Sequence, residues 1–356
     1  MGVGTFGTGR PRLTQLAYQQ HLATMLANLL LIAAGCVLLY FGADWLVRGA
    51  STIADALGAP KAVIGLTLVA FGTSAPEMFV NLLAGYQGET GFALSNVAGS
   101  NLTNICVGFG LCGLLGTVAI KWSTFRADFM VLVLSAGMIA GILLVFRAVP
   151  RLPFWTTVPL LGVLTIYLIS LGRRGVAGPA RLPRAETSAA SLWLQVGLVL
   201  LGVAALYGGG KLVLASAISI AQRFHVDPAL IGLTIVAAGT SVPDTIASVI
   251  AARRQEHEIA VGNLLGSNIS NVLVVLSGTL LASRLGGKPA ASPGVLLASG
   301  DILVDYVMVC VVSLALVAVA ATMERVRRPA GIALLVFYFG YMTYRVIVEL
   351  VLRSAA

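Results

Sequence analysis

The chain has 356 residues, of which 58% are hydrophobic and only 10% are charged, and its formal net charge is +9. Because soluble domains carry about 25% charged residues, this composition excludes a soluble globular protein and indicates a polytopic membrane protein. The positive charge does not indicate a nucleic-acid partner, since Lys and Arg stand singly or in small groups between apolar runs, where they orient a membrane protein.

The apolar runs predict an all-α membrane protein with ten transmembrane helices. A helix needs about 20 apolar residues to cross the bilayer core, and lipid-facing backbone must form its hydrogen bonds within the helix. A polar lead over residues 1–24 comes first. The spans are expected at 25–48, 60–86, 92–116, 127–147, 153–172, 192–217, 228–251, 259–283, 297–321 and 330–352. The cysteines at 36, 106, 112 and 310 lie within these spans and predict no disulfide framework.

The longest polar connection, residues 173–190, separates two five-helix repeats over 25–172 and 191–356. With five spans per half, the second half enters the membrane from the opposite side, which predicts an inverted repeat with its binding site near the midplane. With the N-terminus outside, thirteen of the 23 Lys and Arg residues lie inside, among them the clusters at 173–184, 253–254 and 325–328. We therefore expect a cytoplasmic 173–190 linker and external termini.

The two halves repeat one another. Residues 64–77 read IGLTLVAFGTSAPE and residues 231–244 read IGLTIVAAGTSVPD, and ten of these fourteen positions are identical. The same register continues downstream, where Asn96, Gly99, Ser100, Asn101 and Asn104 recur as Asn263, Gly266, Ser267, Asn268 and Asn271. This pattern is an internal duplication, and each copy places one acid, Glu77 or Asp244, inside an apolar run.

Glycine and proline interrupt the helix that carries each acid. Gly72 and Pro76 lie in the second span, and Gly239 and Pro243 lie in the seventh. Because proline removes a helix hydrogen bond and clashes with the preceding turn, we expect both helices to kink or open. An opened turn frees backbone carbonyls for cations. The candidate carbonyls, one turn before the threonines of the motif, are those of Ala70 and Ala237.

Oxygen-bearing side chains share helix faces with the acids. The pairs separated by four residues, which therefore lie on one face, are Thr73–Glu77, Thr240–Asp244, Ser100–Asn104 and Ser267–Asn271. These side chains offer oxygen and no sulfur or imidazole. All-oxygen ligation favours hard cations such as calcium or sodium over zinc or copper, so we expect transported ions and no resident cofactor.

The acids have no basic neighbours in sequence. No Lys or Arg lies between Ala62 and Ile120 or between Pro228 and Ala252, so Lys211 and Arg48 are the nearest candidate partners. A charged side chain at the bilayer centre costs at least about 2.5 kcal/mol. For the acids, the structural alternative is a buried salt bridge or a neutral acid. For the Ser and Asn residues, the structural alternative is interhelical hydrogen bonding. Two unpaired acids favour compensation by a bound cation.

Other polar residues within the spans predict structural roles. Asp44 and Lys211 occupy equivalent positions in the two halves, which suggests structural pairing. Asp301 and Asp305 lie near the start of the ninth span, where we expect an outward-facing wet surface. Asn81 extends the face of Thr73 and Glu77, although its counterpart is a serine. Four glycines are expected to let helices approach closely, namely Gly65, Gly99, Gly232 and Gly266.

These motifs resemble the two alpha-repeats of the sodium/calcium exchangers, in the calcium/cation antiporter superfamily, over residues 60–108 and 227–275. The resemblance implies that calcium is held by Glu77 and Asp244 with the carbonyls of Thr73 and Thr240. It implies sodium sites at Ser74, Ser241, Ala70, Ala237, Ser100 and Ser267, with Asn104 and Asn271 at the polar positions of the third and eighth spans. Some prokaryotic relatives carry an acid at the position of Asn271, and this chain does not.

The resemblance implies a minimal prokaryotic antiporter that exchanges sodium for calcium across the cell membrane. The two ions compete for the acids, and the first and sixth spans slide to alternate access. A calcium/proton antiporter of the same superfamily is the closest alternative. An intramembrane aspartyl protease also needs two membrane acids, but its Gly-x-Gly-Asp signature is missing, since residues 298–301 read ASGD. A passive channel fits duplicated ligands at one midplane site less well.

Overall fold

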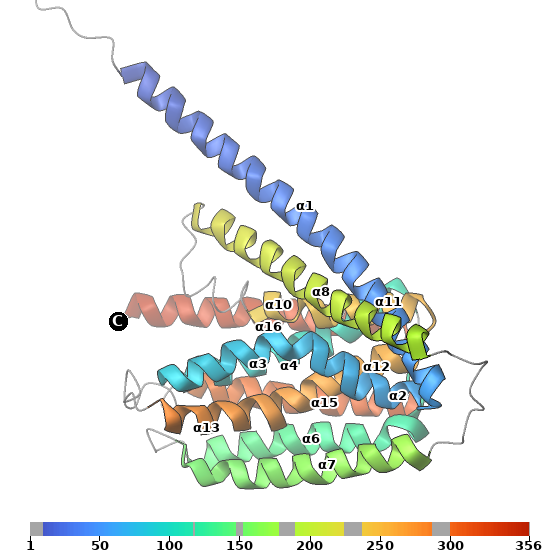
Figure 1. Ribbon diagram of the computed structural model, residues 1–356. Helices are drawn as coiled ribbons and strands as arrows, with labels where there is room; N and C mark the ends of the chain where they lie inside the picture. The colour runs from blue at the N-terminus through green and yellow to red at the C-terminus, as the bar shows by residue number, and fades with distance from the viewer. Residues whose placement is uncertain are drawn as a thin grey trace, which may run out of the picture.

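The chain folds into a bundle of long helices in the computed structural model, which describes residues 10–116, 118–146, 152–177, 189–223, 237–286 and 300–355 (Figure 1). Within these residues eight helices are long and apolar enough to cross a membrane, or nine if one bent pair counts as a single span. They are Ala23–Leu57, Thr90–Leu115, Trp122–Val145, Phe154–Gly175, Leu192–Arg223, His257–Leu285, Ile302–Met323 and Arg328–Val348, with the bent pair at Lys61–Ala75 and Glu77–Gln87. Each coincides with a span expected from the sequence. The expected span 228–251 begins outside the described residues.

The elements follow one another along the chain in two comparable series. The first series is α1 (Arg10–Leu57), α2 (Lys61–Ile64), η1 (Gly65–Val69), α3 (Ala70–Gln87), α4 (Thr90–Leu102), η2 (Thr103–Gly108), α5 (Phe109–Leu115), β1 (Val118–Ala119), α6 (Trp122–Val145), η3 (Phe154–Thr156) and α7 (Thr157–Ala177). The second series is α8 (Ala189–Arg223), α10 (Ala237–Thr240), α11 (Val242–Arg253), α12 (His257–Ser270), η5 (Asn271–Leu276), α13 (Ser277–Leu285), α15 (Gly300–Met323), β2 (Arg325–Val326) and α16 (Arg328–Ala355). The segments η1, η2 and η5 are π-helical and η3 is a 3₁₀ turn.

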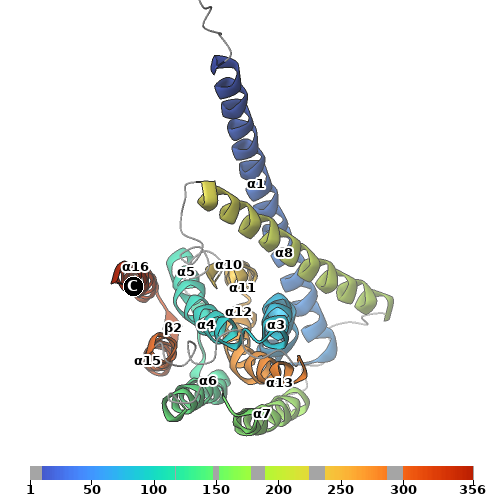
Figure 2. The same ribbon diagram turned by 90° about the vertical axis from the view of Figure 1, so that its left-hand side faces the viewer.

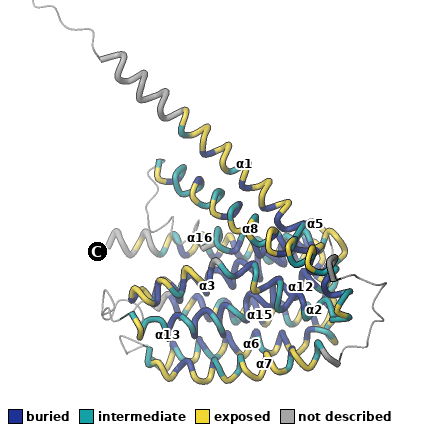
Figure 3. Tube along the Cα trace, viewed as in Figure 1, coloured by how far each residue is buried: buried dark blue, intermediate teal, exposed yellow. Residues whose placement is uncertain are grey.

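The helices that contain α4 and α12 form the centre of the bundle (Figure 2). In the most apolar window of these two spans, 83% and 89% of the residues are buried, against 39% or less in the other six. Figure 3 shows the same contrast, because the middle of the bundle is buried whereas much of α1 is exposed. The outer apolar faces are those expected of helices that meet lipid, and the polar residues of interest lie inside.

Glycines bring α12 against the backbone of α2 and η1. A Cβ atom added at Gly266 would lie 2.6 Å from the carbonyl oxygen of Leu66, and one at Gly262 would lie 2.9 Å from that of Ala62. A Cβ atom at Gly65 would lie 2.8 Å from the carbonyl oxygen of Ile259. Only glycine permits this approach, so the predicted packing role of Gly65 and Gly266 is confirmed. The two acid-bearing repeats therefore meet backbone to backbone.

The helices α1 and α8 form a second close pair, which leans away from the rest of the bundle (Figure 1). Glycines recur every seven residues on both helices, at 35, 42 and 49 in α1 and at 202 and 209 in α8. A Cβ atom at Gly42 would lie 2.9 Å from the carbonyl oxygen of Gly202, and one at Gly35 would lie 2.8 Å from that of Gly209. Small residues at a helix–helix contact allow this close packing in a membrane.

Asp44 on α1 is paired, although not with its predicted partner. Arg48 Nε lies 2.9 Å from Asp44 Oδ2 on the same helix, and Arg254, after the end of α11, forms an ion pair with Asp44 Oδ1. The structural role predicted for this acid therefore holds, but its partners are the two arginines. Lys211, on α8, is exposed.

Glu256, in the turn between α11 and α12, makes further polar contacts at the same end of the bundle. Ser51 on α1 donates a hydrogen bond to Glu256 Oε1 at 2.7 Å. Lys61 Nζ, at the start of α2, lies 2.8 Å from both carboxylate oxygens of Glu256. We call the contacts of Asp44 with Arg254 and of Ser51 with Glu256 the α1 clasp, because they join α1 to the core.

A two-stranded antiparallel sheet closes this end of the bundle. Val118 of β1 pairs with Val326 of β2, and Ala119 pairs with Arg325. These strands are not predicted from the sequence, because two residues are too short a run for a periodic pattern. The pairing fixes the direction of the helices on either side, since β1 leads into α6 and β2 follows α15. The starts of α6 and α15 therefore lie at opposite ends of the bundle.

A buried acid near the start of α6 is neutralised by the neighbouring helix α7. Asp128 is fully buried, and Arg174 donates two parallel hydrogen bonds to it, from Nη1 at 2.9 Å and from Nη2 at 2.7 Å. Tyr167 donates a third, from its hydroxyl to Asp128 Oδ1 at 2.9 Å. A bidentate arginine–carboxylate pair is among the stronger polar contacts in proteins.

The second half of the chain contains a matching cluster between α15 and α16. Asp305 is buried, accepts a hydrogen bond from the Tyr341 hydroxyl at 2.5 Å, and lies 3.2 Å from Arg345 Nε. The expectation that Asp305 faces a wet outer surface is therefore wrong, because its side chain is buried against partners on another helix, forty residues away in the case of Arg345. The side chain of Asp301 lies outside the described residues. We call these two clusters the Asp–Arg–Tyr triads.

We predict that Asp128→Asn lowers the free energy of unfolding by about 3 kcal/mol, because it leaves a partly buried arginine without its counter-ion. This value is at the lower end of the expected range since the Arg174 side chain keeps 29% exposure. Thermal unfolding in detergent measures the effect, with the exposed Glu89→Gln as the control.

The double variant Asp128→Leu, Arg174→Leu should recover most of the lost stability, since removing both charges leaves neither group unpaired. A double variant that is no more stable than Asp128→Asn alone would contradict the assignment of the loss to an unpaired charge.

Candidate functional site

The two acids of the repeated motif lie where their helices are broken. The axis bends by 55° between Lys61–Ala75 and Glu77–Gln87. In the second repeat, Ser241 has φ −88° and ψ 2° and separates α10 from α11, which begins with Pro243 in its first turn. The predicted interruption of both helices is confirmed. Each acid follows its break directly, within the first turn of the next helical segment.

Both acids are buried, and neither has a basic partner in the part of the chain that the structure describes. Glu77 is 1% exposed and Asp244 is 0% exposed. None of the ion pairs between described residues includes either acid, and the two carboxylates lie close enough to interact electrostatically. Arg48, one of the two candidate partners, binds Asp44 instead. The salt-bridge alternative is therefore not what the structure contains.

Neutral donors from both repeats surround Asp244. Asn104 Nδ2, in the first repeat, donates a hydrogen bond to Asp244 Oδ2 at 2.8 Å. The hydroxyls of Thr73, Ser74 and Ser267 lie near the same carboxylate, although those of Ser74 and Ser267 form no hydrogen bond with it. Four predicted site residues thus converge on Asp244, three of them from the opposite repeat. Neutral donors orient a carboxylate but leave its negative charge uncompensated.

Several oxygens of the predicted site have no hydrogen-bond partner although they are buried. They are both carboxylate oxygens of Glu77, Asp244 Oδ1, the hydroxyls of Ser74, Ser241 and Ser267, and the amide oxygens of Asn104 and Asn271. Native proteins leave few buried polar atoms without a hydrogen bond, and such exceptions usually have a specific cause, for example a bound ion. These oxygens form the donor set of a hard cation, which would satisfy many of them at once.

The remaining predicted residues lie in the same region. The Ser100 and Thr240 hydroxyls, from opposite repeats, are 3.4 Å apart. The Thr73 hydroxyl is 2.9 Å from the carbonyl oxygen of Val69 and 3.2 Å from that of Ala70. Ala237 is the first residue of α10, and its side chain lies outside the described residues.

Asn263 is a site residue that the sequence analysis did not single out. Its Oδ1 accepts a hydrogen bond from the Thr73 hydroxyl at 3.0 Å, and its Nδ2 donates to the backbone oxygen of Asp244 at 3.1 Å and to Ser248 Oγ at 2.9 Å. One amide therefore ties the threonine of the first repeat to the acid of the second. Its recurrence in the duplicated block was the available signal.

A second amide pair joins the repeats on α4, α12 and η5. Asn271 Nδ2 donates to Asn101 Oδ1 at 3.2 Å, and Asn101 Nδ2 donates to the backbone oxygen of Asn268 at 3.3 Å. Both Asn104 and Asn271 lie in π-helical turns, η2 and η5, which the sequence did not predict. Such turns shift backbone groups out of the regular helical ladder and occur frequently at functional sites.

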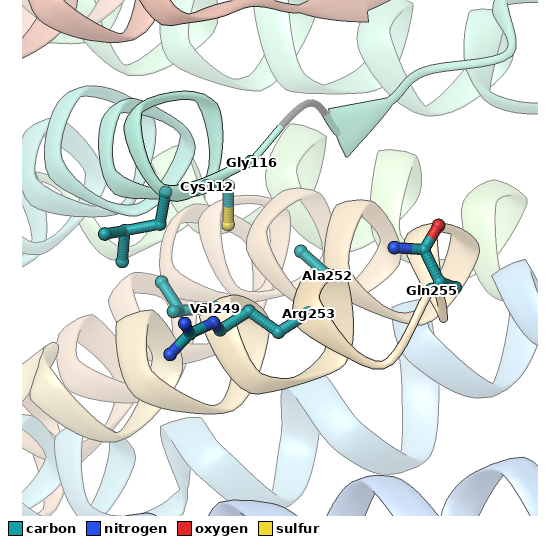
Figure 4. Close-up of a pocket in the computed structure, with 7 residues that line it drawn as sticks. Cys112, Gly116, Val249, Ala252, Arg253 and Gln255 are labelled. Atoms are coloured by element: carbon teal, nitrogen blue, oxygen red, sulfur yellow. The ribbon is translucent and has the colours of Figure 1, made fainter.

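Among the described residues, one cavity and one small crevice lie near the broken helices, and the crevice touches the predicted site. A cavity of about 190 Å³ is lined by Cys112, Val249, Arg253 and neighbours at the C-terminal end of α11 (Figure 4). Neither Glu77 nor Asp244 is among the residues that line this cavity. A crevice of about 10 Å³, close to the volume that holds one water, is lined by Phe71 and Ser74 among others. All four cysteines are free, in agreement with the predicted absence of a disulfide framework.

Comparison with known proteins agrees with this arrangement. A family model described as "Sodium/calcium exchanger protein" matches residues 27–172 and 194–347, so it covers both acids. The chain is 35% identical over 327 residues to the "Putative antiporter CaxA" of Alkalimonas amylolytica, which spans 89% of this chain and 98% of that protein. It is 27% identical to the "Sodium/calcium exchanger MaX1" of Methanosarcina acetivorans, over 88% of this chain and 97% of that protein.

Among solved structures, the chain is similar to the sodium-calcium exchanger NCX_Mj soaked with 10 mM Na⁺ and zero Ca²⁺. The TM-score is 0.73 at 26% sequence identity, and the match covers 90% of this chain and 99% of that chain. The family and its structural neighbours are transporters, which removes the intramembrane protease alternative.

We predict that Glu77→Gln raises the thermal unfolding temperature in metal-free buffer, because it removes a buried charge that no side chain compensates. Calcium at about 100 times its dissociation constant should stabilise the unsubstituted protein by about 2.7 kcal/mol, and should stabilise the variant much less.

Asp128→Asn is the matched control, since that acid has an arginine partner and its neutralisation should act in the opposite direction. A Glu77→Gln protein that melts well below the unsubstituted protein in metal-free buffer would show that Glu77 has a compensating partner after all.

Proposed function

The chain belongs to the sodium/calcium exchanger protein family, and on that premise we propose that it exchanges sodium for calcium across the cell membrane by alternating access. Membership makes it a multi-pass membrane antiporter of that superfamily. The choice of sodium as the coupling ion is our proposal. It draws support from two similar proteins, MaX1 and NCX_Mj, which are named sodium/calcium exchangers.

The observation that carries the proposal is the pair of buried acids without basic partners. Calcium takes six to eight oxygen ligands, preferably including carboxylates, and the two repeats together supply two. We assign calcium to Glu77, Asp244 and the backbone carbonyls of Thr73 and Thr240. We assign sodium to Ser74, Ser241, Ser100, Ser267 and the carbonyls of Ala70 and Ala237, with Asn104 and Asn271 orienting the acids or bound water.

The charge balance of this site explains why ions must exchange. With neither ion bound, two uncompensated carboxylates lie in a low-dielectric core. The conformational change that alternates access is costly in this state. One calcium ion neutralises both, as do sodium ions distributed over the neighbouring oxygens. Because only a loaded site has its charge compensated, the conformational change is permitted with either load and opposed in the empty state. That coupling is the property that distinguishes an exchanger from a channel.

We propose that the bundle contains ten membrane helices in two inverted repeats, 25–172 and 191–356. Two observations support this: the family model matches the chain in two segments of similar length, and the Asp–Arg–Tyr triads lie at opposite ends of the bundle. The first and sixth spans, α1 and α8, are proposed to slide as the moving pair. Each sliding step then breaks and reforms the α1 clasp.

A calcium/proton antiporter of the same superfamily is the second candidate. The same two acids, lacking basic partners, are groups that protons would neutralise. Against this candidate, the third and eighth spans present Asn104 and Asn271, whose amides cannot carry a titrating proton. Sodium can still bind their oxygens.

We predict that a sodium gradient drives calcium uptake into proteoliposomes and that a proton gradient alone does not. With more than two sodium ions exchanged per calcium ion, making the interior positive with valinomycin and external potassium should accelerate uptake into sodium-loaded vesicles. The driving force is about 2.3 kcal/mol per net charge per 100 mV. Glu77→Ala and Asp244→Ala should each abolish this flux while the protein stays folded in the membrane.

Glu89→Gln, at an exposed acid, is the matched control and should transport normally. Uptake driven by a pH step in sodium-free buffer would replace the sodium assignment by the proton antiporter. Near-normal flux through either alanine variant would remove that acid from the ligand set.

We predict that the 173–190 linker is cytoplasmic, from the odd number of spans per half and the Arg clusters. A cysteine at Gly178, with the four native cysteines replaced, should react with a membrane-impermeant maleimide only after the cells are opened. Labelling in intact cells would reverse the orientation.

A further inference from the structure

The two repeats differ at the residue one turn after each acid. Asn81 follows Glu77 by four residues on α3, and Ser248 follows Asp244 by four residues on α11. Both side chains are fully buried. Ser248 is used within the protein, because its hydroxyl accepts the hydrogen bond from Asn263 at 2.9 Å. In Asn81, only the amide nitrogen has a hydrogen-bond partner among the described residues.

The orientation of the Asn81 amide is set by its own helix. Its Nδ2 donates a hydrogen bond to the backbone oxygen of Glu77 at 2.7 Å. A flipped amide would place two acceptor oxygens against each other, so the nitrogen must face this carbonyl. The amide oxygen Oδ1 is thereby directed away from the helix backbone, and it has no hydrogen-bond partner although the residue is 0% exposed.

The residue equivalent to Asn263 does not occupy this oxygen. Asn96 is the counterpart of Asn263 in the first repeat, and its Nδ2 also lacks a hydrogen-bond partner. In the second repeat the Asn263 amide joins Thr73, Asp244 and Ser248. Among the described residues, the Asn96 amide does not make the equivalent set of hydrogen bonds in the first repeat. The asymmetry leaves one extra buried oxygen one helical turn after Glu77.

Unpaired oxygens follow one another along this face of α3. Glu77 and Asn81 are spaced by four residues in the regular helical segment that follows the bend, so they share a helix face on successive turns. Their unpaired atoms are both Glu77 carboxylate oxygens and Asn81 Oδ1, all buried. This set has a single formal negative charge and otherwise neutral oxygens. It matches the charge of a monovalent cation, whereas a calcium ion is better matched where Glu77 and Asp244 act together.

We propose that Asn81 Oδ1 is a cation ligand and that, with Glu77, it forms a monovalent-cation subsite for sodium or potassium that exists only in the first repeat. The proposal rests on the proposed function in one respect, which is that Glu77 binds transported ions. An ion in this subsite takes Glu77 away from calcium, so its occupancy favours release of calcium from the shared site. Because the second repeat has no such oxygen, the two acids are unequal partners in the competition.

The test uses Asn81→Ser, which removes the amide oxygen and keeps the helix contact, since a serine hydroxyl donates to the carbonyl four residues earlier. It also gives the first repeat the residue that the second repeat has. In proteoliposomes loaded with radioactive calcium, the external sodium concentration for half-maximal calcium release should rise about tenfold, as expected from losing one ligand contact of ~1.4 kcal/mol. The half-saturating calcium concentration in calcium–calcium exchange should change less than twofold.

Potassium titrations at fixed sodium distinguish the two possible occupants. If potassium accelerates release by the unsubstituted protein and not by Asn81→Ser, the subsite binds potassium; if only the sodium dependence shifts, it binds sodium. Asn96→Ala is the matched control, and its dependence on both monovalent ions should be unchanged. If Asn81→Ser shifts neither ion, or if Asn81→Ser and Asn96→Ala alter sodium and calcium dependence equally, Asn81 is only a packing amide and the proposal fails.

A measurement without transport separates this proposal from the proposed exchange. Sodium chloride or potassium chloride, compared with choline chloride, should raise the unfolding temperature of the unsubstituted protein in detergent and raise that of Asn81→Ser much less. If this difference holds while sodium fails to drive calcium flux, the subsite stands and the sodium/calcium assignment falls. If sodium drives flux and the salt effect is equal in the two proteins, the exchange stands and the subsite falls.

Discussion

Two carboxylates inside a membrane bundle, with no basic side chain among the described residues to neutralise them, impose the constraint on which the rest of this structure depends. The protein treats its other buried acids differently, because Asp44, Asp128 and Asp305 all have arginine partners. Glu77 and Asp244 alone among the five buried acids of the described residues lack ion pairs. Their helices are broken beside them, and hydroxyl and amide groups converge from both repeats. The surrounding hydroxyl and amide groups orient the carboxylates, and a bound cation is needed to neutralise their negative charge.

Much of this arrangement follows from sequence for simple physical reasons. Apolar length predicted the spans, proline predicted the breaks, and the absence of Lys and Arg around the motifs predicted unpartnered acids. The π-helical turns could not be predicted, since no residue type marks an extra residue in a helical ladder. The partner of Asp305 could not be predicted either, because pairing between separate helices depends on tertiary packing. Asn263 shares its repeated block with asparagines that serve packing, and the sequence does not distinguish between these roles.

The contacts of α1 are of two unlike kinds. With α8 it packs through glycines at backbone distance, a contact that water cannot replace without separating the helices. With the core it is joined in part by the α1 clasp, whose arginine side chain keeps 34% exposure. Partly exposed ion pairs contribute little net stability, because water and salt substitute for them readily. The α1 clasp therefore adds little to the cost of separating α1 from the core, which rests mainly on apolar packing of residues such as Leu46 and Ala50.

The Asp–Arg–Tyr triads have a consequence for how the chain enters the bilayer. Each triad lies within a single helical hairpin, α6–α7 or α15–α16, so the acid and its base are delivered to the membrane by adjacent segments of one chain. An unpaired Asp or Arg in a helix carries an insertion penalty of about 2.5–3.5 kcal/mol at the bilayer centre, and pairing within the hairpin lowers it. The peripheral hairpins are thus self-sufficient insertion units. The central helices are not, since Glu77 and Asp244 acquire their polar surroundings only when the two halves of the chain assemble.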